Sequence, residues 1–241
     1  MTIASEITQS QTNLVNSYTA CQNKGATMPA SQNFDNLATC IASISSGGEY
    51  QLQRIVDDNN NEIGTAFMEF ADANNNKYKV VCLDAQYRVK GSYYFCSSMT
   101  AITNMPITDD ITNGFWGTLP YTATENTQLI LDYCTANNYT STACTHCRSL
   151  SFTIGGTTYY GQFPNMIEVV EMWKRPSAIE SMDTSASSYT DVNFSTKRNM
   201  IVSTQSTAQN CWLFGVTGSI SEVPKSLTGQ LVIPVLEIPV S

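Results

Sequence analysis

The sequence contains few charged residues and only one histidine. Lys, Arg, Asp and Glu make up 13% of the 241 residues, with 12 basic and 20 acidic side chains and a formal net charge of −8. Neutralisation of phosphate by Lys and Arg supplies most non-specific affinity for nucleic acid, so this composition argues against a nucleic-acid partner. The same shortage of basic residues argues against binding to anionic membrane surfaces.

Long apolar runs are also absent. No stretch approaches the roughly 20 apolar residues that span a bilayer, so we expect no membrane insertion. Residues 1–6 have neither the basic nor the apolar region of a secretion signal. We therefore expect a protein that is made in the cytoplasm and either stays there or leaves in a particle released by lysis.

Motifs that carry chemistry are scarce. Serine-type catalysis would have to use His146 as its base, and the sequence has no Gly-x-Ser-x-Gly motif. Gly155-Gly156 lacks the lysine of a phosphate-binding loop. Asp57-Asp58 and Asp109-Asp110 are interpreted as solvated turn residues, although either pair could contribute to a calcium site. We expect no catalytic residues, no metal site and no cofactor.

The cysteines offer one alternative to that expectation. Cys144-Thr145-His146-Cys147 could bind zinc or act as a redox dithiol, but a structural zinc site needs two more ligands and no second CxxC is present. Without a secretion signal, reduced and buried thiols are the default for all eight cysteines. They stand at Cys21, Cys40, Cys82, Cys96, Cys134, Cys144, Cys147 and Cys211.

The first 47 residues are predicted to form a helical hairpin. Apolar residues recur at helical spacing over 3–22 and again after Pro29, with Gly25 and Gly47-Gly48 placed to end the two helices. A hairpin of this size is too small to be stable alone and needs a partner surface. We expect its apolar stripes to form an attachment or oligomer interface made of Ile7, Leu14, Tyr18, Phe34, Leu37 and Ile41.

Residues 48–241 combine strand and helix patterns, which predicts an α+β domain. The strand patterns span 62–70 and 78–83 around a turn rich in Asn, and a closing strand is predicted at 231–238. The helix patterns begin at Glu125 and at Met166. In the second helix, Asn165 is expected to cap the N-terminus and Glu168 to lie near its positive end.

Part of the hairpin sequence resembles a known module. The segment 23–29 (Asn-Lys-Gly-Ala-Thr-Met-Pro), with 34–38 (Phe-Asp-Asn-Leu-Ala) and 41–44 (Ile-Ala-Ser-Ile), is similar to a short helical module of tailed-phage structural proteins. In those proteins the module is joined to unrelated domains. The resemblance implies attachment or oligomerisation on a virion, with other virion proteins as partners.

The rest of the chain carries a second resemblance. Asn126-Thr127 opening a helix, Ala143-Cys144, Gly155-Gly156, Phe163-Pro164-Asn165 and the final strand follow each other in the order found in phage and bacterial C-type-lectin-like domains. The resemblance implies a domain of a kind that usually displays a binding surface and performs no chemistry. The chain departs from it at 201–205, where Ile-Val-Ser-Thr-Gln replaces a Trp-Ser-Ser-Thr-Glu type motif, so no role of that Trp or Glu is carried over.

Recognition residues are expected between 203 and 230. Amide and hydroxyl side chains are common there among turn signals, and such groups suit hydrogen bonding to sugar or protein. Trp212 is assigned to the core. The residues predicted to bind ligand are Gln205, Ser206, Gln209, Asn210, Lys225 and Ser226.

These patterns predict an α+β protein in two parts. Residues 1–47 would form a helical hairpin, and 48–241 a C-type-lectin-like domain with short twisted antiparallel strands and two helices. The expected function is that of a non-enzymatic, homo-oligomeric virion protein that binds a host-surface glycan or protein. Two alternatives remain: a head or tail decoration protein without receptor binding, and a zinc- or thiol-dependent enzyme that uses Cys144 and Cys147.

Overall fold

The computed structural model of the chain divides into two compact units, Met1–Gln51 and Leu52–Ser241. The predicted boundary after residue 47 lies outside the described residues. None of the described helices combines the length and the apolar character needed to cross a bilayer. The structure describes residues 3–23, 29–37, 50–72, 76–105, 122–193, 199–215 and 217–240.

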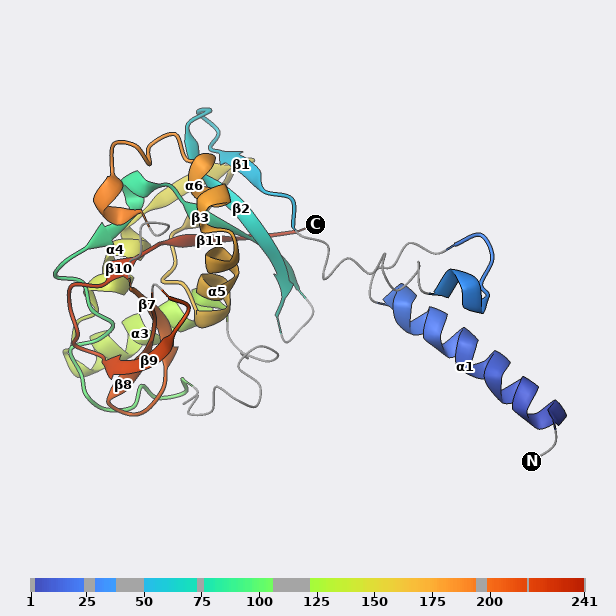
Figure 1. The fold of residues 1–241 in the computed structure, drawn as a ribbon. Helices are drawn as coiled ribbons and strands as arrows, with labels where there is room; N and C mark the ends of the chain where they lie inside the picture. Colours follow the sequence, from blue (N-terminus) through green and yellow to red (C-terminus); the bar gives the residue numbers. More distant parts are fainter. Residues whose placement is uncertain are drawn as a thin grey trace. The chain divides into compact units, whose positions relative to one another are not determined.

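The first unit contains the predicted long helix. α1 (Ile3–Asn23) matches the predicted span of 3–22 closely (Figure 1). A second helical turn covers 34–37, and Asn33 Oδ1 caps it by accepting the Asn36 N–H at 2.9 Å. Tyr18 joins the two segments, because its side chain is 1% exposed and its hydroxyl donates to the Asn33 carbonyl oxygen at 2.8 Å. The chain therefore folds back on α1, as a hairpin requires.

The predicted interface residues of this unit differ in exposure. Tyr18 is buried within the unit, whereas Leu14 and Leu37 are half-buried. Phe34 is 61% exposed, and Val15, which the sequence analysis did not select, is 59% exposed. The two exposed apolar side chains suit a contact with another surface, whereas Tyr18 is corrected to a residue of the unit's own interior. The Ile7 side chain and all of Ile41 lie outside the described part of the chain.

The second unit has an α+β fold, which confirms the predicted class. Its first sheet has the strand order β1-β2-β3-β11, and every neighbouring pair is antiparallel. The predicted hairpin is confirmed by β2 and β3, and Figure 1 shows β11 beside β3 although most of the chain separates them. The strands are β1 (Gln53–Val56), β2 (Glu62–Ala71), β3 (Lys77–Leu83) and β11 (Val235–Pro239).

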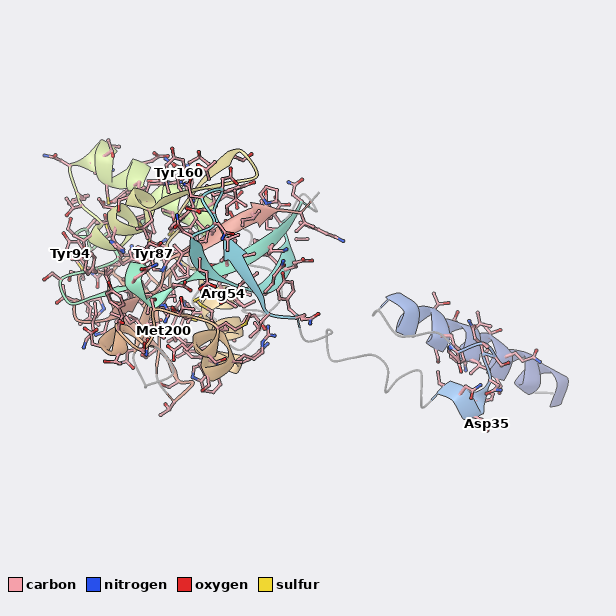
Figure 2. The ribbon with its side chains drawn as sticks, turned by 90° about the horizontal axis from the view of Figure 1, so that it is seen from above. Asp35, Arg54, Tyr87, Tyr94, Tyr160 and Met200 are labelled. Atoms are coloured by element: carbon pink, nitrogen blue, oxygen red, sulfur yellow. The ribbon has the colours of Figure 1, made fainter. Side chains whose placement is uncertain are left out.

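Arg54 of β1, labelled in Figure 2, holds the end of β3 in place. Its Nη1 and Nη2 donate to the two carboxylate oxygens of Asp84 at 2.7 Å each, and Asp84 is 1% exposed. This bidentate geometry satisfies a buried carboxylate that would otherwise be costly.

The second sheet departs from the prediction of antiparallel strands at one pair. Its order is β4-β10-β7-β8-β9, and β10 pairs with β7 in parallel through Leu231 and Met200. A separate hairpin, β5 (Ser151–Ile154) and β6 (Thr157–Tyr160), turns through Gly155-Gly156, whose φ angles of 60° and 77° favour glycine. The second sheet contains β4 (Val89–Lys90), β10 (Leu231–Val232), β7 (Met200–Gln205), β8 (Asn210–Phe214) and β9 (Ile220–Pro224).

Four α-helices lie in the described part of this unit, two more than predicted. α3 (Ala123–Asn137) begins before the predicted Glu125, with Thr122 as its N-cap and Glu125 completing a capping box. Asn126 and Thr127 therefore do not open the helix, and that prediction is wrong. They lie one turn inside it and are buried, and the Thr127 hydroxyl accepts the Phe163 N–H at 2.9 Å.

Three further α-helices follow α3 in the chain: α4, α5 and α6. The predicted helix at 166–173 is confirmed by α5 (Met166–Lys174), in which Asn165 and Glu168 form a capping box. The short 3₁₀ turns are Ala85–Tyr87 and Thr190–Val192. The remaining helices are α4 (Thr142–Ser149) and α6 (Pro176–Ser181).

Two apolar clusters form the core of the second unit. One joins β2, β3, α5 and the second sheet, and Trp212 belongs to it with 4% exposure, which confirms its assignment to the core. The other joins α3, α4 and the opposite side of the second sheet around Ile130, Phe163 and Ile201. The second sheet therefore has apolar residues packed on both faces.

A buried carboxyl pair connects the N-termini of α3 and α5. Both carboxylate oxygens of Glu237 in β11 accept N–H groups of α3, from Ala123 and Thr124, at 2.8 Å each. Glu168, 1% exposed, accepts the Asn165 N–H at 2.8 Å. Burial raises the pKa of Glu168 well above its ordinary range, and the nearby charge of Glu237 raises it further. Glu168 is therefore the member of the pair that retains its proton.

We expect Glu168→Gln to flatten the pH dependence of stability. The folded pKa of Glu168 lies above its unfolded value, so its contribution is full below about pH 4.5 and is lost as pH rises toward the folded pKa. In that window the wild-type free energy of unfolding falls by about 1.4 kcal/mol per pH unit for this proton. The amide of Glu168→Gln cannot ionise. The free energy of unfolding of this variant, measured by urea titration, should therefore rise relative to that of the wild type as pH increases from 5 to 8. Parallel profiles for the two proteins would contradict this expectation, and Glu171→Gln on the partly exposed surface of α5 is the matched control.

Candidate ligand groove

Two loops that are far apart in sequence form a groove on the second unit. One loop precedes α3 in the chain, and the other connects β7 to β8. The groove has a volume of about 550 Å³. Its lining includes amide, hydroxyl, thioether and methyl groups, and none of the described lining residues is charged. They are Met99, Thr100, Ala101, Thr207, Ala208, Gln209 and Asn210.

The β7–β8 loop is shaped by its own hydrogen bonds. The Thr207 hydroxyl accepts the N–H groups of Gln209 at 3.3 Å and Asn210 at 3.0 Å. Such side-chain-to-backbone bonds are typical of Thr in tight turns. Asn210 begins β8 and donates from Nδ2 to Glu222 of β9 at 3.2 Å. The turn leaves Gln209 exposed at the groove and Asn210 half-buried beside it.

The opposite wall is fixed by a hydroxyl cluster. Ser98 and Thr100 share a hydrogen bond of 2.8 Å between their hydroxyls, and both hydroxyls also contact that of Tyr133 on α3. The Ser97 N–H donates to the carbonyl oxygen of Thr140, just before α4. This wall is therefore held by groups from α3 and from the α3–α4 connection.

Lys225 ties the two walls together from beneath. Its side chain is fully buried, and Nζ donates to the carbonyl oxygens of Thr100 and Ala208 at 2.8 Å each and to Gln205 Oε1 at 2.6 Å. Burial lowers the pKa of Lys225 to about 8, while the thiols of Cys96 and Cys211 oppose that change. At neutral pH the Lys225 side chain is thus mostly protonated, and three oxygen acceptors take the place of the water that would hydrate its ammonium group.

Gln205 completes this connection. Its Oε1 also accepts the Ile102 N–H at 3.0 Å, and its Nε2 donates to the Met105 carbonyl oxygen at 3.1 Å. Both polar atoms of the amide are thus used within the protein, which satisfies the requirement for a buried side chain of this type.

The structure corrects half of the predicted ligand residues. Gln205, Ser206 and Lys225 are fully buried and cannot present a binding surface. Gln205 and Lys225 instead support the groove from below, because their polar groups are paired with backbone from both loops. Gln209 and Asn210 do line the groove. Ser226 is exposed and donates to Met99 Sδ at 3.9 Å, which places it next to the lining.

Five of the lining residues were not predicted from the sequence. Thr207 and Ala208 lie inside the segment 203–230 in which recognition residues were expected, but Met99, Thr100 and Ala101 lie outside it. No local pattern signals that these three residues face the β7–β8 turn. The two loops are linked by Lys225, whose acceptor Thr100 lies 125 positions away in the sequence.

The CxxC motif lies away from solvent. Cys144 and Cys147 are both on α4 and fully buried, and burial raises the pKa of Cys144 to about 12 and that of Cys147 as well. Thiolates, which bind metals and attack electrophiles, are therefore disfavoured at both positions. Within the described residues, no group of three or more His, Cys, Asp or Glu side chains is arranged to hold a metal ion.

Comparisons with protein-family models, curated proteins and solved structures found no match to this chain.

Proposed function

We propose that the chain is a non-enzymatic structural protein of a tailed-phage particle that binds a neutral glycan or polar peptide segment of the host surface in the groove. The observation that carries the proposal is the groove itself: polar, uncharged, and rimmed by the exposed Gln209 and half-buried Asn210. Amide groups beside methyl and thioether surface suit a ligand with hydroxyl or amide groups. The rigid floor of Lys225 and Gln205 lowers the entropy lost on binding.

The element order supports the finer assignment of a lectin-like domain. A first hairpin is followed by a long helix, a short helix that contains Ala143-Cys144, the glycine turn, the Asn165-capped helix and a closing strand. Apart from the helix start at Asn126-Thr127, which the structure contradicts, these are the features, in the same order, on which the resemblance to C-type-lectin-like domains rests. We assign the first unit to attachment or self-association because of its exposed Val15 and Phe34. Several copies on one particle would convert weak single contacts into strong binding.

The proposal predicts that changing the groove rim weakens binding without loss of stability. In Gln209→Ala/Asn210→Ala, removal of two polar contacts should reduce affinity about tenfold or more, as is common for residues at the centre of an interface. The measurement is binding of labelled protein to an array of purified bacterial surface polysaccharides, with thermal melting to show that the fold is intact.

The matched control is Asn59→Ala/Gln86→Ala, which removes two exposed amides of the same unit outside the groove lining. It should bind like the wild type. Equal binding by wild type and the groove variant would exclude the groove as the site. No binding by the wild type to any polysaccharide or to intact cells would favour the decoration protein.

A further inference from the structure

The second apolar cluster of the unit is rich in thiols. Five cysteines belong to it, and all are nearly or fully buried. Two of them have sulfur atoms within hydrogen-bonding distance of each other. The five are Cys96, Cys134, Cys144, Cys147 and Cys211.

That pair is Cys96 and Cys134. Their Sγ atoms are 3.5 Å apart, although the residues are 38 positions apart in sequence. Cys96 lies in the loop that leads to the groove wall, where its N–H donates to the Lys225 carbonyl oxygen. Cys134 lies in the last turns of α3 and is 4% exposed. Two sulfurs in van der Waals contact need to approach by only about 1.5 Å to reach the 2.05 Å bond length of a disulfide.

The surroundings of Cys96 favour its thiolate. The Ser98 N–H donates to its sulfur at 3.3 Å, and Cys134 is placed to donate its S–H. These hydrogen bonds, with the Cys134 thiol contributing most and the charge of Lys225 adding to them, lower the pKa of Cys96 to about 7. The pKa of Cys134 is raised, first by the same hydrogen bond and then by burial. One partner is therefore the nucleophile, and the other retains its proton.

We propose that Cys96 and Cys134 are an oxidation site at which peroxide forms a disulfide that joins the groove wall to α3. The Cys96 thiolate attacks one oxygen of hydrogen peroxide, which breaks the O–O bond, gives the sulfenic acid and releases hydroxide. The sulfur of Cys134 then attacks the sulfenic sulfur, and the sulfenic oxygen leaves as water with the proton of the Cys134 thiol. The two thiols together lose two electrons, and these electrons reduce the peroxide. The released hydroxide combines with the proton that Cys96 lost on ionisation and forms the second water.

The disulfide would act on the groove without adding a contact to it. It would close a long loop of the unfolded chain and fix the segment between Cys96 and the Met99–Ala101 wall. A particle that leaves a reducing cytoplasm would meet conditions in which the bond persists. The oxidation site does not depend on the proposed function, because it requires only that peroxide reach the two sulfurs.

The test uses the full-length protein and hydrogen peroxide. After treatment, the protein is unfolded, alkylated without reductant and weighed by intact mass spectrometry. We expect two fewer alkylated cysteines out of eight than in the untreated protein, with full recovery after dithiothreitol. Digestion with trypsin and a glutamate-specific protease cuts after Glu125 and Arg148, which places Cys96 in residues 91–125 and Cys134 in residues 126–148 together with Cys144 and Cys147. Fragmentation of the crosslinked peptide pair by tandem mass spectrometry then shows which of these three cysteines is bonded to Cys96. The melting temperature should rise by about 10 °C.

Three variants sharpen the result. Cys134→Ser should let the Cys96 sulfenic acid accumulate for labelling by dimedone, and Cys96→Ser should remove both label and crosslink. Cys211→Ala, which removes a buried thiol of the same cluster, should leave the crosslink intact. If all eight cysteines of the wild type stay alkylatable after peroxide, or if the crosslink joins any other pair, the proposal is wrong. The wild-type result decides this even if a variant fails to fold.

Discussion

Replacement of Arg88 by methionine is expected to lower the free energy of unfolding of the second unit by about 4 kcal/mol. The Arg88 guanidinium is 1% exposed and pairs with Glu180 at 3.3 Å and Asp183 at 3.2 Å. Its Nε also donates to the Leu83 carbonyl oxygen at 3.0 Å. Methionine fills part of the volume but leaves two buried carboxylates without their cation, and that loss dominates the cost.

The effect can be measured by urea denaturation followed by tryptophan fluorescence. All three tryptophans lie after residue 52, so the signal reports on the second unit alone. Arg148→Met is the matched control, since Arg148 donates to the exposed Gln128 at 2.8 Å, and a change below about 0.5 kcal/mol is expected. A similarly small change for Arg88→Met would mean that the two carboxylates are protonated or rehydrated in the folded protein.

Lys225→Met should cost about 3 kcal/mol and loosen both walls of the groove. The substitution removes three hydrogen bonds from one ammonium group and leaves Gln205 Oε1 and two carbonyl oxygens short of a donor in a buried site. Relief of the buried charge offsets part of this loss, which is why the expected value is below that for Arg88. The loops 97–101 and 206–209 should then exchange amide hydrogens faster.

Hydrogen exchange read by mass spectrometry separates this expectation from a general loss of stability. Peptides from the two loops should lose protection more than peptides from α5, which Lys225 does not contact. Lys174→Met, on a side chain that is 54% exposed, should leave both regions unchanged. Uniform loss of protection over the unit would show that Lys225 stabilises the core generally and does not position the groove.

Local chemistry predicted much of the fold. The caps at Asn165 and Glu168, the hairpin of β2 and β3, and the glycine turn each depend on residues a few positions apart. For such features the stabilising groups stand next to each other in the sequence. The start of α3 was misjudged because Asn126 and Thr127 are good capping residues by type, whereas Thr122 with Glu125 offers the complete capping box.

The groove could be predicted only in part because its architecture depends on distant partners. A lysine among turn residues indicates an exposed charge, and the sequence around Lys225 contains no hint of the acceptors at Thr100 and Ala208. Gln205 was placed at the surface for the same reason. Buried polar residues of this kind are recognised only when their hydrogen bonds are known. Gln209 is exposed and Asn210 half-buried in a local turn, and both predicted residues line the groove.

The pairing of β3 with β11 has a consequence during protein synthesis. Roughly 150 residues separate Leu83 from Val235, so at about 5–20 residues per second the ribosome needs roughly 8–30 s to deliver the partner strand. Throughout that interval the nascent chain holds a strand with the apolar run Val80-Val81-Cys82-Leu83 and one unpaired edge. Such an edge is a template for association with neighbouring chains, so the nascent chain is exposed to aggregation through β3 until β11 pairs with it.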